Sequence, residues 1–187
     1  MEKTLILIKH DAVQRGLIGE ILKRFEQKGL KIAGMKMVQP TEEMVKKHYI
    51  VTDEWAKKVG ENTRKSAEKK GIKVTETDKQ IAKRIQQYNA DYLMEGPIIA
   101  IVFEGYHAIE IGRKIIGNTE ARKADIGTIR GDYSVDSYDL AEQKKRSVRN
   151  LIHGSENSEQ AENEMNLWFT KKELHEYKKK EWEVMHK

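Results

Sequence analysis

Two short and nearly uninterrupted apolar runs place the strictest limit on how this chain can fold. Residues 4–8 and 98–103 consist almost entirely of aliphatic and aromatic side chains, and each run has the length of one strand. A strand without alternating polar positions is expected to be buried on both faces. We therefore predict a central sheet that contains these two strands, with further strands at residues 30–38 and 150–153.

Helical patterns occupy the intervals between the predicted strands. Apolar residues recur at helical spacing within residues 17–25 and 108–116. Thr41 can cap a short third helix, and Ser158 can cap a last one. The main order is strand, helix, strand, strand, helix, strand, which is the ferredoxin-like (βαββαβ) arrangement of an α+β protein with an antiparallel sheet. That fold carries many functions, so it does not name one.

Three segments do not fit this core and predict additions to a single domain of 187 residues. Residues 53–90 are rich in Lys, Glu and Gln, and we expect one or two peripheral helices there, broken near Gly71. Residues 134–148 form a second polar insertion. Residues 170–187 form a lysine-rich tail, which we expect to be a surface helix.

Composition narrows the class of function without naming it. The chain has 35 Lys and Arg against 30 Asp and Glu, a net charge of +5, which suits nucleic acids, acidic membranes or phosphorylated small ligands. It has no cysteine, which excludes disulfides, thiolate chemistry and cysteine-bound zinc. No apolar stretch is long enough to span a bilayer, and the N-terminus lacks a signal-peptide cleavage site, so we expect a cytoplasmic protein with no membrane partner.

A histidine at the end of the fourth predicted strand is the first candidate for chemistry. His153 is followed at once by Gly154 and Ser155, and a helix begins shortly behind them. Free N–H groups at a helix N-terminus attract anions, and a neutral imidazole there can attack a phosphoryl group. The alternative is a histidine that caps the strand and bonds to backbone, which is the commoner role of an isolated histidine.

Other residues support the phosphoryl interpretation. Lys9, Arg113 and Arg130 supply three cations, and Thr119 adds a hydroxyl, which together suit a polyphosphate. Glu164 lies on the helix behind the histidine. A carboxylate bonded to one ring nitrogen would fix the tautomer and leave the other nitrogen nucleophilic. The combination indicates phosphoryl transfer through a phosphohistidine.

In these segments the chain closely resembles the nucleoside diphosphate kinases. The matching segments are residues 4–19, His48-Tyr49, Gly96-Pro97, residues 113–117 with Thr119, residues 127–132, residues 150–155, and residues 161–164 with 167–169. The segment around the histidine and the loop at residues 127–132, in this order, are very specific. The resemblance implies transfer of the terminal phosphate of a nucleoside triphosphate such as ATP to a nucleoside diphosphate in two steps.

The resemblance also implies roles for individual residues. It implies that His153 is the phosphorylated nucleophile and that Glu164 orients it. It places Lys9, Tyr49, Arg113, Thr119 and Arg130 around the phosphates, Asn150 with Lys9 on the sugar hydroxyl, and Ser155 beside the transferred phosphate. It further implies a Mg²⁺ ion on the phosphates, for which we assign no protein ligand. A homo-oligomer, either a hexamer or a tetramer, is expected.

The chain departs from the family pattern at two positions near this site. His10 stands where the family usually has proline. The base-stacking phenylalanine of the family would fall within the first insertion, where Ile85 or Tyr88 are the candidates. The alternatives are a non-catalytic protein that binds nucleotides or nucleic acid on the same scaffold, and a phosphohydrolase that passes the phosphate to water. The presence of every matched site residue favours the kinase.

Overall fold

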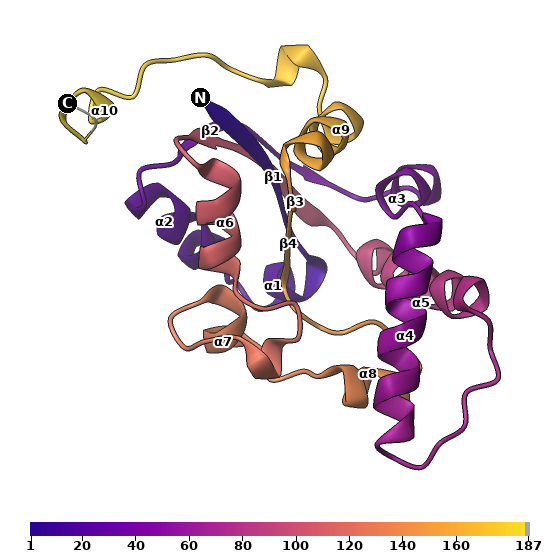
Figure 1. Ribbon diagram of the computed structural model, residues 1–187. Coiled ribbons are helices and arrows are strands. Elements are labelled where there is room, and N and C mark those ends of the chain that lie inside the picture. Colours follow the sequence, from indigo (N-terminus) through magenta and orange to yellow (C-terminus); the bar gives the residue numbers. More distant parts are fainter. Residues whose placement is uncertain (186–187) are drawn as a thin grey trace.

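A computed structural model describes residues 1–185 and shows a four-stranded sheet with helices on both faces (Figure 1). The strands are β1 (Glu2–Ile8), β2 (Lys31–Val38), β3 (Ile98–Gly105) and β4 (Ile152–Gly154). Their order across the sheet is β2-β3-β1-β4, and each neighbouring pair is antiparallel. The predicted ferredoxin-like fold is therefore confirmed.

The helices follow the predicted pattern and add several short elements. They are α1 (His10–Gln14), α2 (Ile18–Gln27), α3 (Glu42–His48), α4 (Asp53–Glu68), α5 (Asp78–Met94), α6 (Ala108–Ile116), α7 (Ile129–Tyr133), α8 (Tyr138–Gln143), α9 (Ser158–Trp168) and α10 (Trp182–Met185), with 3₁₀ turns η1 (Ala121–Lys123) and η2 (Lys171–Glu173). None of the helices within residues 1–185 is long and apolar enough to cross a membrane.

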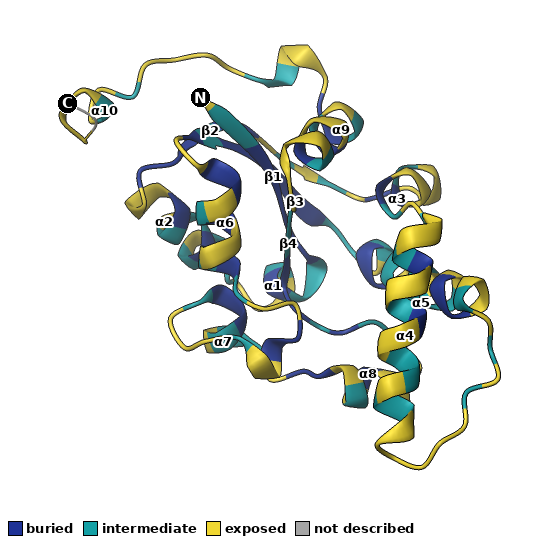
Figure 2. Ribbon diagram, viewed as in Figure 1, coloured by how far each residue is buried: buried dark blue, intermediate teal, exposed yellow. Residues whose placement is uncertain are grey.

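The apolar run of β1 is uninterrupted because both of its faces are covered. Ile6 and Ile8 belong to a core cluster that includes residues of α2 and α6. Leu5 and Leu7 alternate with them and belong to a second cluster, under α3, α5 and α9. Figure 2 shows the central strands as the most deeply buried part of the chain, with exposed residues on the outer sides of the helices. The sheet is thus the middle of three layers.

The fourth strand is shorter than predicted and begins two residues later. The predicted strand at residues 150–153 is wrong in its first half, because Leu151 has a left-handed backbone with φ of 67°. The amides of Asn150 and Leu151 bond to the hydroxyl of Tyr92 and not to a neighbouring strand. Only Ile152 to Gly154 pair with β1.

The prediction that Ser158 caps the last long helix is also wrong by one residue. Asn157 has the extended backbone of an N-cap, and its side-chain oxygen accepts a hydrogen bond from the amide of Gln160 at 2.8 Å. Ser158 is the first residue inside α9.

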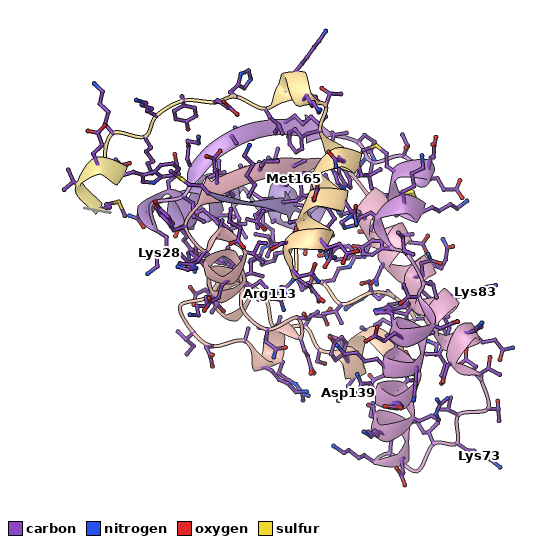
Figure 3. The ribbon with its side chains drawn as sticks, turned by 45° about the horizontal axis from the view of Figure 1, so that its top comes forward. Lys28, Lys73, Lys83, Arg113, Asp139 and Met165 are labelled. Carbon is purple, nitrogen blue, oxygen red and sulfur yellow. The ribbon has the colours of Figure 1, made fainter. Side chains whose placement is uncertain are left out.

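The first insertion forms the expected pair of helices, α4 and α5, separated near Gly71. The second insertion contains α8 and lies against α4 and α5. Asp139 forms an ion pair with Lys70 at 2.6 Å, and Glu142 forms one with Arg84 at 3.1 Å. Asp139 is labelled beside α4 in Figure 3. The two insertions therefore contact each other at one edge of the domain.

The prediction of a surface helix over residues 170–187 is wrong for most of the described tail. After η2 the chain runs extended along β2 until the four-residue α10. The amide of His175 donates to the carbonyl of Ala33 at 2.7 Å, and the indole of Trp182 donates to that of Gly29 at 2.8 Å. These contacts, with β2 and with the turn before it, take the place of the hydrogen bonds of a helix. Residues 186 and 187, the end of the predicted helix, lie outside the described residues.

Candidate active site

Strand register directs the candidate nucleophile toward α9. His153 pairs with Leu7 across β4 and β1, and directly opposed residues share one face of a sheet. Leu7 faces the cluster under α3 and α9, so His153 faces these two helices as well. α9 carries Glu164, and α3 ends at His48.

The predicted pairing of His153 with a carboxylate is present in the structure. Nε2 of His153 lies 2.8 Å from Oε1 of Glu164. Ser155 donates its hydroxyl to the other carboxylate oxygen at 2.6 Å, and Gln160 donates to Oε1 at 2.9 Å. Burial alone would raise the pKa of Glu164, but the interactions with His153, His48 and Ser155 lower it to about 2. An ionised carboxylate thus holds Nε2–H and leaves Nδ1 as the ring nitrogen turned away from it.

A second histidine, for which the sequence predicts no role, packs against His153. The rings of His48 and His153 meet edge to face, with centroids 4.6 Å apart. The indole of Trp168 donates to Nδ1 of His48 at 3.3 Å. Burial, with a contribution from His153, lowers the pKa of His48 to about 3, so its ring is neutral at physiological pH. The only signal in the sequence was its place beside Tyr49 in a matched motif.

Lys9 and Asn150 meet where β1 ends. The ammonium of Lys9 donates to Oδ1 of Asn150 at 2.8 Å. The side-chain amide nitrogen Nδ2 of Asn150 donates to the backbone carbonyl of Thr119 at 3.1 Å. Lys9 is 6% exposed, and its Nζ lies 4.5 Å from the centre of the Tyr92 ring. Burial, reinforced by the charge of Arg130, lowers the pKa of Lys9 to about 7. Lys9 can therefore gain a proton when an anion binds close to it.

The three predicted cations differ in their surroundings. Arg130 is buried and donates to three backbone carbonyls, those of Gly117 at 3.0 Å, Asn150 at 3.2 Å and Ile152 at 2.6 Å. Its guanidinium therefore fixes the backbone that leads into β4. Arg113 is half-exposed, and its nearest carboxylate is that of Glu156 at 3.9 Å. Figure 3 shows Arg113 on α6, and the side chain of Thr119 is exposed in the loop that follows this helix.

Tyr49 completes the group at the end of α3. Its ring packs against the ring of His48 with centroids 4.7 Å apart. Burial raises the pKa of Tyr49 well above its ordinary value, and the charge of Glu164 adds to this effect. The phenol therefore stays protonated and can donate a hydrogen bond.

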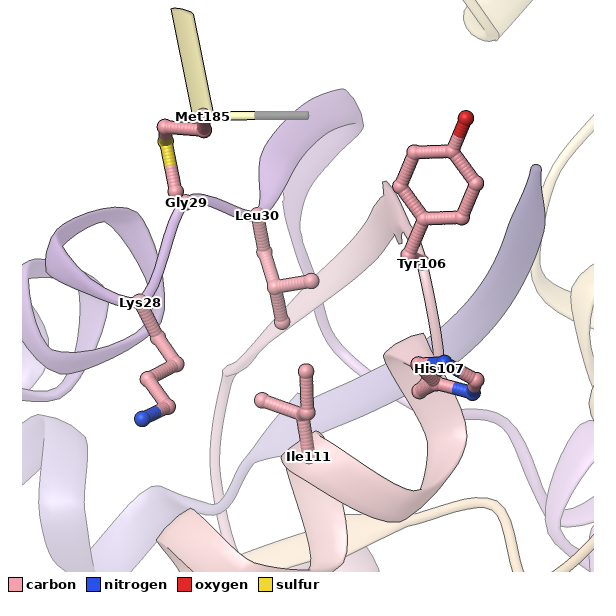
Figure 4. A pocket seen from close by; sticks show the side chains of 7 residues that line it. All are labelled: Lys28, Gly29, Leu30, Tyr106, His107, Ile111 and Met185. Carbon is pink, nitrogen blue, oxygen red and sulfur yellow. The ribbon is translucent and has the colours of Figure 1, made fainter. Parts of the chain in front are cut away.

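Two hollows of the described surface lie at the other end of the sheet. One of about 450 Å³ is lined by the residues labelled in Figure 4, among them Tyr106, His107 and Met185. A second of about 680 Å³ lies beside it, between the tail and the first residues of β1. None of the predicted site residues lines either hollow.

Comparison with known proteins gives a family assignment that fits this geometry. Residues 2–69 and 77–174 match the sequence model of the family described as nucleoside diphosphate kinase. The nucleoside diphosphate kinase of Pyrobaculum aerophilum is 41% identical over 179 residues, covering 93% of this chain and 98% of the relative. Nucleoside diphosphate kinase B of Bos taurus is 38% identical, covering 95% of this chain and 91% of its own length.

Solved structures agree with the sequence comparison. The crystal structure of an NDP kinase from Pyrobaculum aerophilum matches with a TM-score of 0.89 and 40% identity, covering 94% of this chain and 99% of that one. A transition-state mimic of the nucleoside-diphosphate kinase from Borrelia burgdorferi, with bound vanadate and ADP, matches with a TM-score of 0.80 and 33% identity, covering 96% and 94%. The chain belongs to the nucleoside diphosphate kinase family.

Proposed function

We propose that this protein transfers the terminal phosphate of a nucleoside triphosphate to a nucleoside diphosphate through a phosphohistidine at His153. The observation that carries the proposal is the bond of 2.8 Å between Nε2 of His153 and the ionised carboxylate of Glu164. It fixes the tautomer in which Nδ1 has a free lone pair. Family membership supports the same reaction.

In the first half-reaction, Nδ1 attacks the terminal phosphorus of the triphosphate. The bond between phosphorus and Nδ1 forms, the bond to the bridging oxygen breaks, and the diphosphate leaves with that oxygen. The imidazole gains positive charge as Nδ1 bonds to phosphorus, and the carboxylate of Glu164 stabilises this charge through Nε2–H. Ser155 helps by holding the carboxylate in place.

The second half-reaction reverses these steps with a different nucleotide. The terminal oxygen of a second diphosphate attacks the phosphorus, the bond to Nδ1 breaks, and neutral His153 is restored. We propose that Lys9, Tyr49, Arg113, Thr119 and Arg130 hold the phosphates during both steps, and that Lys9 and Asn150 hold the sugar hydroxyl. The bond between Lys9 and Asn150 supports a shared role.

We propose that a Mg²⁺ ion is held mainly by the substrate phosphates and not by side chains of this protein. Mg²⁺ prefers oxygen ligands and is commonly held by substrate phosphates with few protein groups. Within residues 1–185, the group of side chains that could ligate a metal is His48, His153 and Glu164, whose two imidazoles suit other ions better. We propose that the phosphates held by Arg113, Thr119 and Arg130 carry the ion. When bound, it offsets phosphate charge during transfer.

We extend the proposal to the residues that contact the nucleotide base, to the oligomeric state and to the cellular compartment. We propose that Ile85 or Tyr88, which lie half-buried on α5, contact the base, since Gln86 between them donates to the carbonyl of Tyr49. We also propose a homo-oligomer, a hexamer or a tetramer, in the cytoplasm. Nucleic-acid binding is not required by this function.

The test is a phosphate-exchange assay between ATP and a second nucleoside diphosphate, with the His153→Gln variant and the matched control His175→Gln. His175 is an exposed histidine of the tail, and its backbone amide donates to the carbonyl of Ala33. We expect acid-labile labelling and exchange in the wild type and the control, and neither in His153→Gln. Full exchange by His153→Gln would exclude the proposed nucleophile. Steady release of inorganic phosphate without an acceptor would instead identify a phosphohydrolase.

A further inference from the structure

Tyr92 lies at the centre of the site although no motif singled it out. It is located near the end of α5 and is 2% exposed. Its ring and its hydroxyl each contact groups that flank the proposed nucleotide site. An aromatic side chain that served only to fill the core would need neither set of contacts.

The ring of Tyr92 lies against two cations. Nζ of Lys9 is 4.5 Å from the ring centre, and the guanidinium carbon of Arg149 is 4.6 Å from it. A cation over an aromatic face is attracted by the ring quadrupole, and more strongly where water is excluded. Lys9 is buried, so the ring and Asn150 are the main contacts that fix the direction of its ammonium group.

The hydroxyl of Tyr92 organises the backbone that leads to His153. It donates to Oδ2 of Asp11 at 2.7 Å. It accepts the amide hydrogens of Asn150 at 3.1 Å and of Leu151 at 3.2 Å. Leu151 has a φ of 67°, a left-handed conformation that is uncommon for a bulky residue and needs support from its surroundings. The phenol oxygen provides partners for the two amides that this conformation removes from the sheet.

We propose that Tyr92 is a positioning residue for phosphoryl transfer, whose ring aims Lys9 and whose hydroxyl fixes the turn that carries Asn150. It acts through these residues and does not itself touch the nucleotide. The proposal rests on the roles proposed above for Lys9 and Asn150. The ring and the hydroxyl of Tyr92 thus have different roles, and different substitutions can remove one or both.

The experiment compares Tyr92→Phe and Tyr92→Leu with the matched pair Tyr177→Phe and Tyr177→Leu. Tyr177 makes similar contacts far from His153: its ring lies 4.9 Å from Nζ of Lys31, and its hydroxyl donates to the carbonyl of Ile32 at 2.9 Å. Two quantities are measured in each variant. One is the rate at which saturating ATP phosphorylates His153, and the other is amide hydrogen exchange at Asn150 and Leu151.

The two Tyr92 variants are expected to differ in a defined way. Tyr92→Phe keeps the ring over Lys9, so phosphorylation at saturating ATP should stay within about twofold of wild type. Loss of the hydroxyl should raise KM for ATP, because the turn that carries Asn150 is less well held, and the two amides should exchange about tenfold faster or more. Tyr92→Leu loses both functions, and phosphorylation should fall about tenfold, with a similar rise in KM for ATP. Phenylalanine thus rescues the rate but not the amide protection. Both Tyr177 variants should match the wild type in both measurements.

Two results would overturn the inference. One is wild-type phosphorylation by a folded Tyr92→Leu together with unchanged amide exchange in Tyr92→Phe. The other is an equal loss in the Tyr177 variants, which would indicate a general effect of removing a tyrosine that contacts a lysine. If the wild type itself shows no phosphate exchange, the proposed function fails, while the amide measurement still reports whether Tyr92 holds the turn.

Discussion

Oε1 of Glu164 lies 2.8 Å from Nε2 of His153, and the same carboxylate accepts the hydroxyl of Ser155 through its other oxygen. Contacts with His153 and Ser155 therefore hold the Glu164 carboxylate in place without a bound substrate. Because α9 supplies the carboxylate and β4 supplies the ring, the packing of this helix on the sheet determines which ring nitrogen is bonded and which one points away from the carboxylate.

Replacement of Glu164 by Gln should slow phosphorylation of His153 by about tenfold to a hundredfold. The amide can still bond to the ring, but it lacks the charge that stabilises the imidazolium in the transition state. Rapid-quench measurement with labelled ATP would report the rate. Glu162→Gln, an exposed substitution on the same helix, is the control and should leave the rate unchanged.

Glu164 should also make stability depend on pH in the acid range. Its pKa is lowered from 4.5 to about 2, so its contribution is complete above pH 4.5 and is lost as pH falls toward 2. The difference in unfolding free energy between wild type and Glu164→Gln should shrink by about 2 kcal/mol between pH 7 and pH 3. Urea denaturation at several pH values would measure it, and a constant difference would contradict the lowered pKa.

Lys9→Met should raise the free energy of unfolding by about 1–2 kcal/mol while abolishing most activity. Burial of the ammonium group is costly, and its pKa of about 7 in place of 10.5 reflects that cost. For the same reason, wild-type stability should rise from pH 7 toward pH 10, because the unfolded chain then binds more protons than the folded one. Lys3→Met, at a partly exposed lysine of β1, provides the comparison. If Lys9→Met has the same free energy of unfolding as the wild type, or a lower one, burial of the Lys9 charge does not destabilise the protein.

Binding of ADP should be accompanied by uptake of about one proton near pH 8. Lys9 is mostly neutral in the free protein at that pH, and the phosphates should restore its charge by raising its pKa. Calorimetric titrations in buffers of different ionisation enthalpy would measure the uptake. The Lys9→Met protein should show little uptake, and a wild-type value near zero would argue against contact between Lys9 and the phosphates.

Asp136→Ala should destabilise the protein by about 3 kcal/mol and weaken nucleotide binding. Asp136 is 5% exposed and accepts bonds from the side chain of Arg146 and from the amide of Arg149, each at 2.6 Å. Arg149 directly precedes Asn150, so loss of this anchor should loosen the sugar contact. Asp139→Ala removes an exposed ion pair of the same insertion and should cost less than about 1 kcal/mol. An equal loss of unfolding free energy in the two variants would show that the buried carboxylate of Asp136 contributes no more than the exposed one of Asp139.

Much of this architecture was predictable because local patterns and tertiary packing agree. The apolar run of β1 predicts burial on two faces, and the sheet has a helical layer on each side. The polar stretch around Gly71 predicts a helical pair, and α4 and α5 form it. The pairing of Glu164 with His153 was predictable because the predicted helix directly follows the strand and the family resemblance implies the contact.

What could not be predicted depends on partners that are distant in the sequence. Leu151 leaves the strand conformation because its amide bonds to Tyr92, 59 residues earlier. Arg130 donates to the carbonyls of Gly117, Asn150 and Ile152, which belong to separate segments of the chain. The tail is extended because β2 supplies hydrogen-bond partners for it. Periodicity within a short window carries no information about such contacts.

The register of β1 has a consequence for how the protein responds to heat. Leu7 opposes His153, the amide of Lys9 donates to Leu151, and the amide of Leu5 donates to Ser155. His153 and Ser155 are thus held in place by contacts with β1, and Lys9 is the residue after it. A small shift of that segment would move all three residues together. The relative backbone positions of these three residues should then persist on heating for as long as the sheet does, whereas the bond between His153 and Glu164 also depends on α9. Activity should therefore disappear at or below the temperature at which the sheet unfolds.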